Sequence, residues 1–416
     1  MDRQQSSKTS RDAVILSAAR TPIGKFMGAL ASLPATELGA HAVKAALEQS
    51  GVEPGTVYEV IMGHVVAAGS GQAPGRQATL KAGLPDTIGA ATVNKVCGSG
   101  LKAVMMAANG IAAREAEVYI AGGMESLSQA PYVLPKARQG LRYGDAALKD
   151  SILLDGLWCS FQDWVMGSAA EFIARQFEVT RAEMDEFSLQ SHERAAKATA
   201  AGRFRHEIVP VEIPQRRSNA VRVERDEGIR ASFDNGDYTL QTNLDILANL
   251  PPAFEEDGQV TAGNAPGLND AGAAMVISSR AEAERQGATP MARVVGYTHA
   301  AVDPKWIFAA PARAIPNLLE KIGWDIQDVD LFEINEAFSS QILANGVELQ
   351  RRGLPLDWEK VNVHGGAIAL GHPLGATGAR VLVTLLHALK QYDLKRGVAS
   401  LCLGGGEAVA LAVEME

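Results

Sequence analysis

Cysteine is scarce in this chain of 416 residues, which has three: Cys97, Cys159 and Cys402. An odd and sparse set of cysteines does not form a disulfide framework. Free thiols of this kind persist in a reducing compartment. We therefore expect a cytoplasmic protein whose cysteines serve chemistry or packing rather than cross-linking.

Positive charge is also in deficit, because 39 Lys and Arg face 48 Asp and Glu, for a formal net charge of −9. Sequence-independent nucleic-acid binding needs an extended cationic face, so no nucleic-acid partner is expected. No stretch approaches the roughly 20 apolar residues that cross a bilayer. Residues 1–12 also lack the apolar core of a signal peptide. We therefore expect no membrane partner. Closely spaced ligand pairs of the kind that zinc needs are missing, so no metal site is predicted.

The composition that remains is that of a globular protein, with 47% hydrophobic and 21% charged residues. The length predicts two or three domains. Strand-like and helix-like segments alternate near both ends of the chain, which is typical of an α/β fold. The predicted strands are 13–18, 57–62, 118–121, 329–334 and 398–403, and the predicted helices are 36–49, 101–113 and 375–386.

Parts of the first alternating region return in the second. Residues 42–51 resemble 314–323, residues 100–104 resemble 378–382, and Gly122-Gly123 resembles Gly405-Gly406. The matches occur in the same order, which predicts a duplicated α/β unit. The alternative is the weak likeness in composition that unrelated α/β segments share.

The middle of the chain, about 126 to 265, has a different character. Two helices are predicted within 167–202, and a run of arginines follows them. Its members are Arg203, Arg205, Arg216, Arg217, Arg222, Arg225 and Arg230. The run is either an ordinary solvated surface or a phosphate-binding lip, because the guanidinium fork suits phosphate oxygens.

The first candidate for chemistry is Cys97, in the segment 96–100, VCGSG. This thiol stands just before a predicted helix, whose N-terminal dipole and unpaired amides favour a thiolate and lower its pKa. Gly98 and Gly100 leave room for an acyl group beside the sulfur. The alternative is a buried structural cysteine.

A second candidate is His372, in the glycine-rich segment 364–378, HGGAIALGHPLGATG. Pro373 stops a helix from running through it, so His372 lies in a fixed loop before the helix 375–386. A neutral imidazole there can take a proton from a thiol or donate a hydrogen bond to a carbonyl. A core histidine satisfied by the backbone is the alternative, and we interpret His364 in that structural way.

Two further candidates follow predicted strands. Cys402 lies at the end of the strand 398–403, before three glycines, and Asn335 follows the strand 329–334. A loop asparagine at such a place can orient a water or a carbonyl oxygen.

Together these segments resemble the thiolases. The segments are VCGSG at 96–100, NEAF at 335–338, GGAIALGHP at 365–373 and CLGGG at 402–406, with RTPIG at 20–24 and AGGMES at 121–126. The likeness runs from about Asp12 to the C-terminus. It implies thiolase-like duplicated α/β halves, layered αβαβα, with an inserted loop domain. The N-terminal half would be 1–125 plus 268–290, the coenzyme A-binding loop domain 126–267, and the C-terminal half 291–416.

The resemblance implies an acyl-CoA C-acetyltransferase. Such an enzyme interconverts two acetyl-CoA with acetoacetyl-CoA plus CoA, or thiolyses longer 3-ketoacyl-CoA, by a ping-pong route through an acyl-cysteine. Cys97 would carry the acyl group, and His372 would activate it. His372 and a water held by Asn335 would stabilise an enolate oxygen. Cys402 would shuttle the proton at the carbon next to the carbonyl, and the amides of Cys97 and Gly404 would form an oxyanion hole.

The same resemblance implies coenzyme A as substrate and product, with no permanently bound cofactor, and a homodimer or homotetramer. Pantetheine-contacting positions correspond to Met166, Phe254, Ala265, Pro266 and Phe338, and Arg230 corresponds to a position near the adenosine. Several residues depart from many short-chain thiolases: Val165 stands for a histidine, Pro266 for a serine, His364 for an asparagine and Glu407 for a methionine. These departures leave the acyl chain length open.

One alternative is a decarboxylating 3-ketoacyl synthase-type condensing enzyme, which shares the fold and the nucleophile. Such enzymes usually pair one cysteine with two histidines, or with a histidine and an asparagine, so the late Cys402 favours a thiolase. A non-catalytic relative would keep the fold and lose the thiols.

Overall fold

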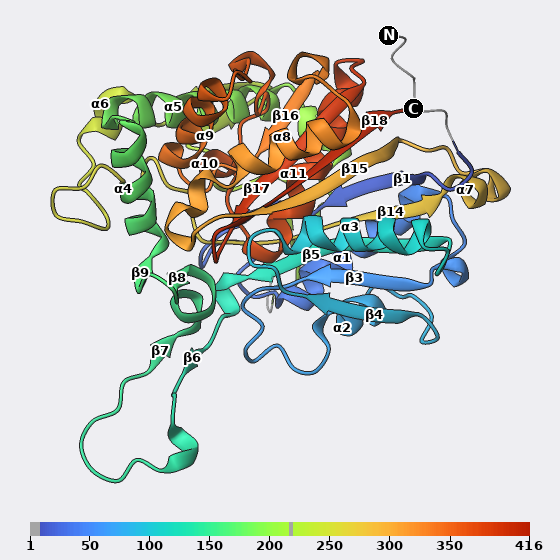
Figure 1. Ribbon diagram of the computed structural model, residues 1–416. Helices are drawn as coiled ribbons and strands as arrows, with labels where there is room; N and C mark the ends of the chain where they lie inside the picture. The colour runs from blue at the N-terminus through green and yellow to red at the C-terminus, as the bar shows by residue number, and fades with distance from the viewer. Residues whose placement is uncertain (1–8, 216–218) are drawn as a thin grey trace.

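The computed structural model describes residues 9–215 and 219–416, and a mixed sheet of 10 strands runs through the molecule (Figure 1). Its order is β16-β17-β18-β15-β1-β14-β5-β3-β4, with β2 paired to β14. The strands are β1 Ala13–Arg20, β2 Gly24–Lys25, β3 Glu59–Gly63, β4 Gly89–Val93, β5 Val118–Ser126, β14 Asn269–Ser279, β15 Ala292–Ala301, β16 Leu331–Ile334, β17 Arg396–Leu403 and β18 Glu407–Met415. At the middle, β1 and β15 meet through two residue pairs, Val14 with Arg293 and Ile15 with Ala292. This short seam divides the sheet into an N-terminal and a C-terminal half.

The helices of the two halves follow the same order along the chain. They are α1 Ala35–Ser50, α2 Pro74–Lys81 and α3 Ser99–Ala112 in the first half, and α8 Pro311–Ile322, α9 Ser339–Arg351, α10 Ala367–Leu370 and α11 Leu374–Gln391 in the second, with α7 Arg280–Gln286 between them. Strand order repeats as well, because β3-β5-β14-β1 in one half corresponds to β16-β17-β18-β15 in the other. The predicted duplication therefore has a structural counterpart.

The matched sequence segments show how close this repeat is. Residues 42–51 end α1 and residues 314–323 end α8, and both helices finish at a left-handed glycine, Gly51 with φ 73° and Gly323 with φ 70°. The match of Gly122-Gly123 with Gly405-Gly406 is wrong, because the first pair lies inside β5 and the second follows the end of β17.

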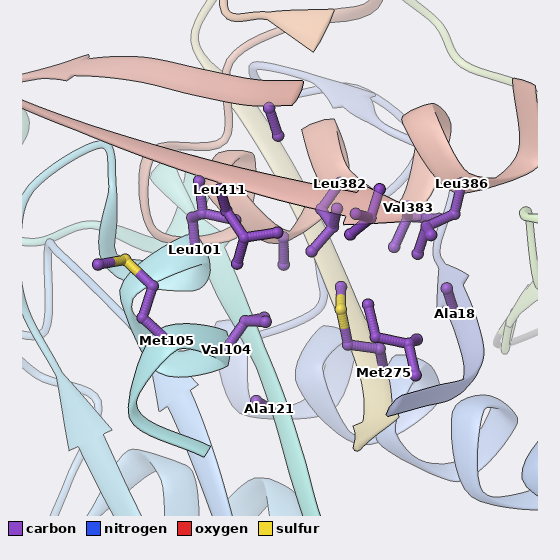
Figure 2. Close-up of a cluster of buried hydrophobic side chains, with 14 of the residues drawn as sticks. Ala18, Leu101, Val104, Met105, Ala121, Met275, Leu382, Val383, Leu386 and Leu411 are labelled. Atoms are coloured by element: carbon purple, nitrogen blue, oxygen red, sulfur yellow. The ribbon is translucent and has the colours of Figure 1, made fainter. Parts of the chain in front are cut away.

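The core has two central helices, α3 and α11, between the two halves of the sheet. Figure 2 shows this cluster, in which Leu101 and Val104 of α3 and Leu382 and Leu386 of α11 lie among side chains of β1, β5, β14 and β18. Helices α1 and α2 cover the outer face of the N-terminal half, and α8 and α9 cover that of the C-terminal half. Strands covered on both faces are buried throughout, as β1 and β14 are. This confirms the expected αβαβα layering.

The two central helices approach each other through glycines. A Cβ on Gly100 would lie 2.7 Å from the backbone N of Ala379, and one on Gly378 would lie 2.5 Å from the backbone N of Leu101. These reciprocal positions require glycine, because any side chain would push the helices apart. The close approach brings the beginnings of α3 and α11 to one place.

The region between β5 and β14 is irregular, as expected. Its helices are α4 Met166–Phe177, α5 Arg181–Ala200 and α6 Leu244–Ala248, and its strand pairs are β6 Tyr132–Val133 with β7 Lys149–Asp150, β8 Trp158–Cys159 with β9 Trp164–Val165, β10 Val211–Ile213 with β11 Val221–Val223, and β12 Ala231–Asp234 with β13 Asp237–Leu240. The connection between β6 and β7 extends away from the body as an arm (Figure 1). None of the described helices is long and apolar enough to cross a membrane.

Candidate functional site

A cavity of about 280 Å³ lies at the start of the two central helices, and Cys97, His372, Cys402 and Gly404 all line it. The rest of its wall is mainly apolar and includes Val96, Leu157, Val165, Leu268, Ile307, Phe308, Ala337 and Leu374. The structure thus brings together three of the four side chains predicted to act in catalysis, although His372 and Cys402 lie 275 and 305 residues beyond Cys97 in sequence.

The repeated fold explains this convergence. Cys97 stands two residues before Ser99, the first residue of α3, and His372 stands two residues before Leu374, the first residue of α11. Because the beginnings of α3 and α11 are adjacent, the thiol and the imidazole face a common space. Cys402 comes from the end of β17, one residue before that strand finishes.

The thiol of Cys97 is neutral in the free chain. Burial raises its pKa to about 12, the Glu125 carboxylate adds to the rise, and hydrogen bonds donated by the backbone N–H groups of Cys97 and Gly404 oppose it. The expectation that the helix start lowers this pKa is therefore wrong, because desolvation outweighs the dipole and the amides. The sulfur needs a base before it can act as a nucleophile.

His372 is held as a neutral base. Burial lowers its pKa to about 3, with the charge of Arg380 contributing. Thr377 Oγ1 donates to the carbonyl oxygen of Pro373 at 2.9 Å and therefore accepts from Nδ1 of His372 at 2.7 Å. This pairing assigns the proton to Nδ1. Within the described residues Nε2 has no hydrogen-bond partner, so its lone pair is free to accept a proton.

Cys402 is buried, and burial raises the pKa of its thiol well above the ordinary value, with the neighbouring Cys97 contributing. Both thiols and the imidazole are therefore uncharged at rest. Removing a proton from either sulfur creates a charge in a desolvated space, which is favourable only when an acceptor and hydrogen-bond donors are already in place.

Asn335 lies just past β16, and its side chain does not line the cavity. Its backbone N–H donates to the carbonyl oxygen of Ser400 at 3.0 Å, which fixes it beside β17. The carboxamide is fully buried, and neither Oδ1 nor Nδ2 has a partner among the described residues. Buried amides are normally hydrogen-bonded, so this one is available to a water or a substrate oxygen.

Five of the six residues matched to coenzyme A contacts line the same cavity: Met166, Phe254, Ala265, Pro266 and Phe338. The rings of Phe254 and Phe338 meet edge to face, with centroids 6.2 Å apart. Arg230 lies outside the cavity, where its Nη2 donates to the carbonyl oxygen of Ala262 at 2.7 Å. Ala262 lies three residues before Ala265, so this hydrogen bond links Arg230 to the segment that lines the cavity.

The arginine run does not form a single lip. Arg203 lies over the ring of Tyr392 and Arg225 over the ring of Phe233, while Arg222 pairs with Glu212 and Glu224. Arg205, Arg222 and Arg225 share one cleft, and Arg203 lines another. Arg216 and Arg217 lie outside the described residues.

Three positioning residues were missed in the sequence. Thr377 holds Nδ1 of His372, and Asn269 Oδ1 accepts from its backbone N–H at 2.9 Å. The buried carboxylate of Glu125 accepts from the N–H of Gly375 at 2.8 Å and of Val65 at 3.1 Å, which ties the start of α11 to β3. Glu125 and Thr377 lie inside segments already noted, but no spacing rule marks their contacts in advance.

Comparison with known proteins agrees with this geometry. The family models described as the thiolase N-terminal domain and the thiolase C-terminal domain match residues 13–281 and 288–415. An acetyl-CoA acetyltransferase of Cupriavidus necator is 52% identical over 403 residues, covering 97% of this chain and 99% of the relative. An acetyl-CoA acetyltransferase of Pseudomonas aeruginosa is 49% identical, with the same coverage.

The structural comparison extends the likeness to the fold. The crystal structure of the Bacillus anthracis acetyl-CoA acetyltransferase superimposes with a TM-score of 0.92 at 44% sequence identity, covering 97% of this chain and 99% of that one. Matched by both family models and about half identical to relatives along almost its whole length, this chain belongs to the thiolase family.

Proposed function

We propose that this chain is an acetyl-CoA C-acetyltransferase that interconverts two acetyl-CoA with acetoacetyl-CoA plus CoA through an acyl-cysteine. One observation carries the proposal: two thiols and one neutral imidazole line a single apolar cavity, where two backbone N–H groups reach the Cys97 sulfur. The names of the relatives support the same reaction and not decarboxylative condensation.

In the first half-reaction, Nε2 of His372 takes the proton of Cys97 as its sulfur attacks the thioester carbon of acetyl-CoA. The carbon–sulfur bond to coenzyme A breaks, and the same proton passes from His372 to the leaving CoA sulfur. The amides of Cys97 and Gly404 would donate to the oxyanion of the tetrahedral intermediate, and one such donor is typically worth roughly 3 kcal/mol of barrier.

In the second half-reaction, Nε2 of His372 takes the proton of the Cys402 thiol, and the resulting thiolate takes a proton from the methyl carbon of a second acetyl-CoA. The resulting enolate oxygen would accept hydrogen bonds from His372 and from a water held by the carboxamide of Asn335. The carbanion then attacks the acetyl group on Cys97, which forms the carbon–carbon bond and breaks the carbon–sulfur bond to Cys97. The released sulfur takes the proton held by His372, which restores both resting groups.

The residues that line the cavity also support coenzyme A thioesters with short acyl chains as the substrates. Its volume of about 280 Å³ has to hold the pantetheine end and the acyl group together. Pro266 offers no hydroxyl to pantetheine, and Val165 adds an apolar contact near the acyl group. Measuring kcat/KM for thiolysis along a series of 3-ketoacyl-CoA lengths tests this; efficiency that rises with chain length would contradict it.

We further infer a homodimer or homotetramer. The edge strand β4 is only partly buried, and an open sheet edge readily pairs with another chain. Apolar side chains on the arm, including Leu141, Tyr143 and Leu148, are exposed and are not covered by other parts of the described chain. The three free cysteines support a reducing, cytoplasmic location. Light scattering coupled to gel filtration measures the mass of the assembly.

Acyl transfer from labelled acetyl-CoA tests the assignment of the two thiols. The variant Cys97→Ala should take up no label. The variant Cys402→Ala should be labelled but release no acetoacetyl-CoA. Cys159→Ala is the matched control, because the third cysteine is buried outside the cavity and its loss should leave both steps intact. Label on the Cys97→Ala protein would overturn the proposal.

A further inference from the structure

A second groove, of about 650 Å³, lies away from the thiol cavity, between α5, the short 3-10 helix Trp358–Lys360 and the turn after α11. No residue lines both. Four cationic side chains line it: Arg194, Lys197, Arg203 and Lys360. Such a concentration of positive charge is unusual in a chain with a net charge of −9.

Two of these four cations are oriented by hydrogen bonds to carbonyl oxygens, which do not neutralise them. Arg194 donates to the carbonyl oxygen of Val361 at 2.6 Å, and Lys360 Nζ donates to that of Val329 at 3.0 Å. Carbonyl oxygens orient a cation without cancelling its charge. Within residues 9–215 and 219–416, no carboxylate forms an ion pair with Lys197, Arg203 or Lys360, and these residues remain free to meet an anion.

The two acidic residues of the groove, Asp330 and Glu359, reduce its formal side-chain charge from four positive charges to a net +2. Asp330 Oδ2 already accepts from the backbone N–H groups of Lys395 and Arg396, at 2.9 and 2.8 Å. Glu359 reaches Arg194 only at 3.5 Å, and its side chain is 84% exposed. The cleft that holds Arg205, Arg222 and Arg225 differs, because it also contains Glu224, Asp234 and Asp237.

An aromatic wall lies beside the cations. Arg203 stands 5.3 Å from the ring centroid of Tyr392, and the ring of His364 lies 5.6 Å from Tyr392 and 5.7 Å from Phe204. His364 is 2% exposed; its Nε2 is 3.3 Å from the Tyr392 hydroxyl, and its Nδ1 has no partner among the described residues. An unpartnered ring nitrogen this deeply buried is rare in a protein interior.

We propose that this groove binds a small organic phosphate of the nucleotide type, at a site separate from the thiol cavity. Arg194, Lys197, Arg203 and Lys360 hold its phosphates, because guanidinium and ammonium groups are the usual partners of phosphate oxygens. The partly exposed ring of Tyr392 and its apolar neighbours Leu331 and Leu394 contact the base. A cationic rim above an apolar wall matches a ligand with one charged and one aromatic end.

Calorimetric titration of the full chain with ADP and with inorganic pyrophosphate tests this site. The double variant Lys197→Glu with Arg203→Glu should bind both probes at least about tenfold more weakly, since it removes two charge-assisted contacts and adds repulsion. The matched control, Arg205→Glu with Arg225→Glu, changes the net charge equally in the other cleft. It should alter binding by no more than about twofold.

Two further variants test where the ligand binds. Tyr392→Ala should weaken ADP more than pyrophosphate, and equal losses would overturn the assignment of the aromatic wall. Arg230→Ala should leave pyrophosphate binding intact. If this variant no longer binds pyrophosphate, the anion binds at the coenzyme A site instead. The proposal also fails if the unmodified chain binds neither probe at millimolar concentration, or if both double variants lose binding equally.

Discussion

The central helices α3 and α11 occupy equivalent places in the two halves, yet their first turns are built differently. The segment that leads into α3 is VCGSG, in which two glycines, Gly98 and Gly100, follow Cys97. The loop before α11 is GHPL, in which Pro373 restricts the backbone and His372 is held at both its ring and its amide. The duplicated unit has diverged into one position open to an acyl group and one rigid position for a base.

The comparison extends to the helices themselves. Every residue of α11 from Leu374 to Leu389 is buried, whereas α3 has a partly exposed face that includes Met106. A helix that is buried all round belongs to the interior of a large protein. The base is therefore carried by the more enclosed element, and the nucleophile by the one nearer the surface. The following predictions test this division, from the largest effect to the smallest.

Replacing the base should have the largest effect. The variant His372→Gln keeps a polar side chain of similar size but removes the Nε2 base, and kcat/KM should fall about 10²- to 10⁴-fold. Steady-state thiolysis of acetoacetyl-CoA measures this. His299→Gln, at an exposed position of β15, serves as the control for a lost histidine. Activity of His372→Gln within about threefold of the parent would mean that α11 does not carry the base.

The pH dependence of thiol reactivity should separate the two loops. Burial raises the pKa of Cys97 to about 12, so its thiolate fraction rises about tenfold per pH unit throughout the neutral and mildly alkaline range. Burial lowers the pKa of His372 to about 3, so this histidine adds no inflection above pH 5. We expect iodoacetamide to alkylate Cys97 at a rate that climbs about 100-fold from pH 7 to 9. A plateau near pH 7 would show a thiolate stabilised by the helix start.

Loss of the hydrogen bond between Thr377 and His372 should reduce activity less than loss of His372 itself. Thr377→Val deletes the oxygen that accepts from Nδ1 and frees the ring to adopt the wrong tautomer, so kcat should fall about 10- to 100-fold with a smaller change in KM. Thr377→Ser keeps the hydroxyl and should recover most of the rate. If the serine variant is as impaired as the valine variant, the threonine acts through packing.

The smallest effect should come from crowding the nucleophile loop. A Cβ on Gly98 would lie 2.2 Å from Cδ2 of Leu403, so Gly98→Ala forces Leu403, the neighbour of Cys402, to shift. Overpacking of this kind costs about 1–3 kcal/mol of the free energy of unfolding. Urea denaturation measures the loss. Gly83→Ala is an unsuitable control because φ there is +86°, so Gly55→Ala, with open space around it, is the reference.

The family, the α/β layering and the thiolase function could be predicted from the sequence and are confirmed, because each depends on local motifs in a fixed order. The elements also agree closely, since buried strands and capped helices have local signatures. The predicted helix 36–49 is α1 Ala35–Ser50. Domain bounds, residue roles and oligomeric state stay predictions.

What the sequence could not supply depends on contacts between distant segments. The pKa of Cys97 was predicted in the wrong direction because burial, not the helix start, dominates it, and burial is a property of the assembled cavity. Thr377 and Asn269 hold the same histidine from positions 108 residues apart, and no periodicity reveals such a meeting. The arginine run looked continuous, yet its members face different clefts.

Each central helix packs against the opposite half of the sheet, and this affects how the chain folds during synthesis. Helix α11 packs against β5 and β14 of the opposite half, and α3 against β18, while β1 and β15 share just two residue pairs. A ribosome that has made roughly the first three hundred residues therefore holds a sheet whose inner surface is covered by α3 but not by α11, since α11 and β18 are translated last. Such a nascent chain exposes aggregation-prone apolar surface for many seconds at ordinary elongation rates. We expect it to depend on chaperone protection until its final stretch emerges, and expect the separated halves to become soluble only when produced together.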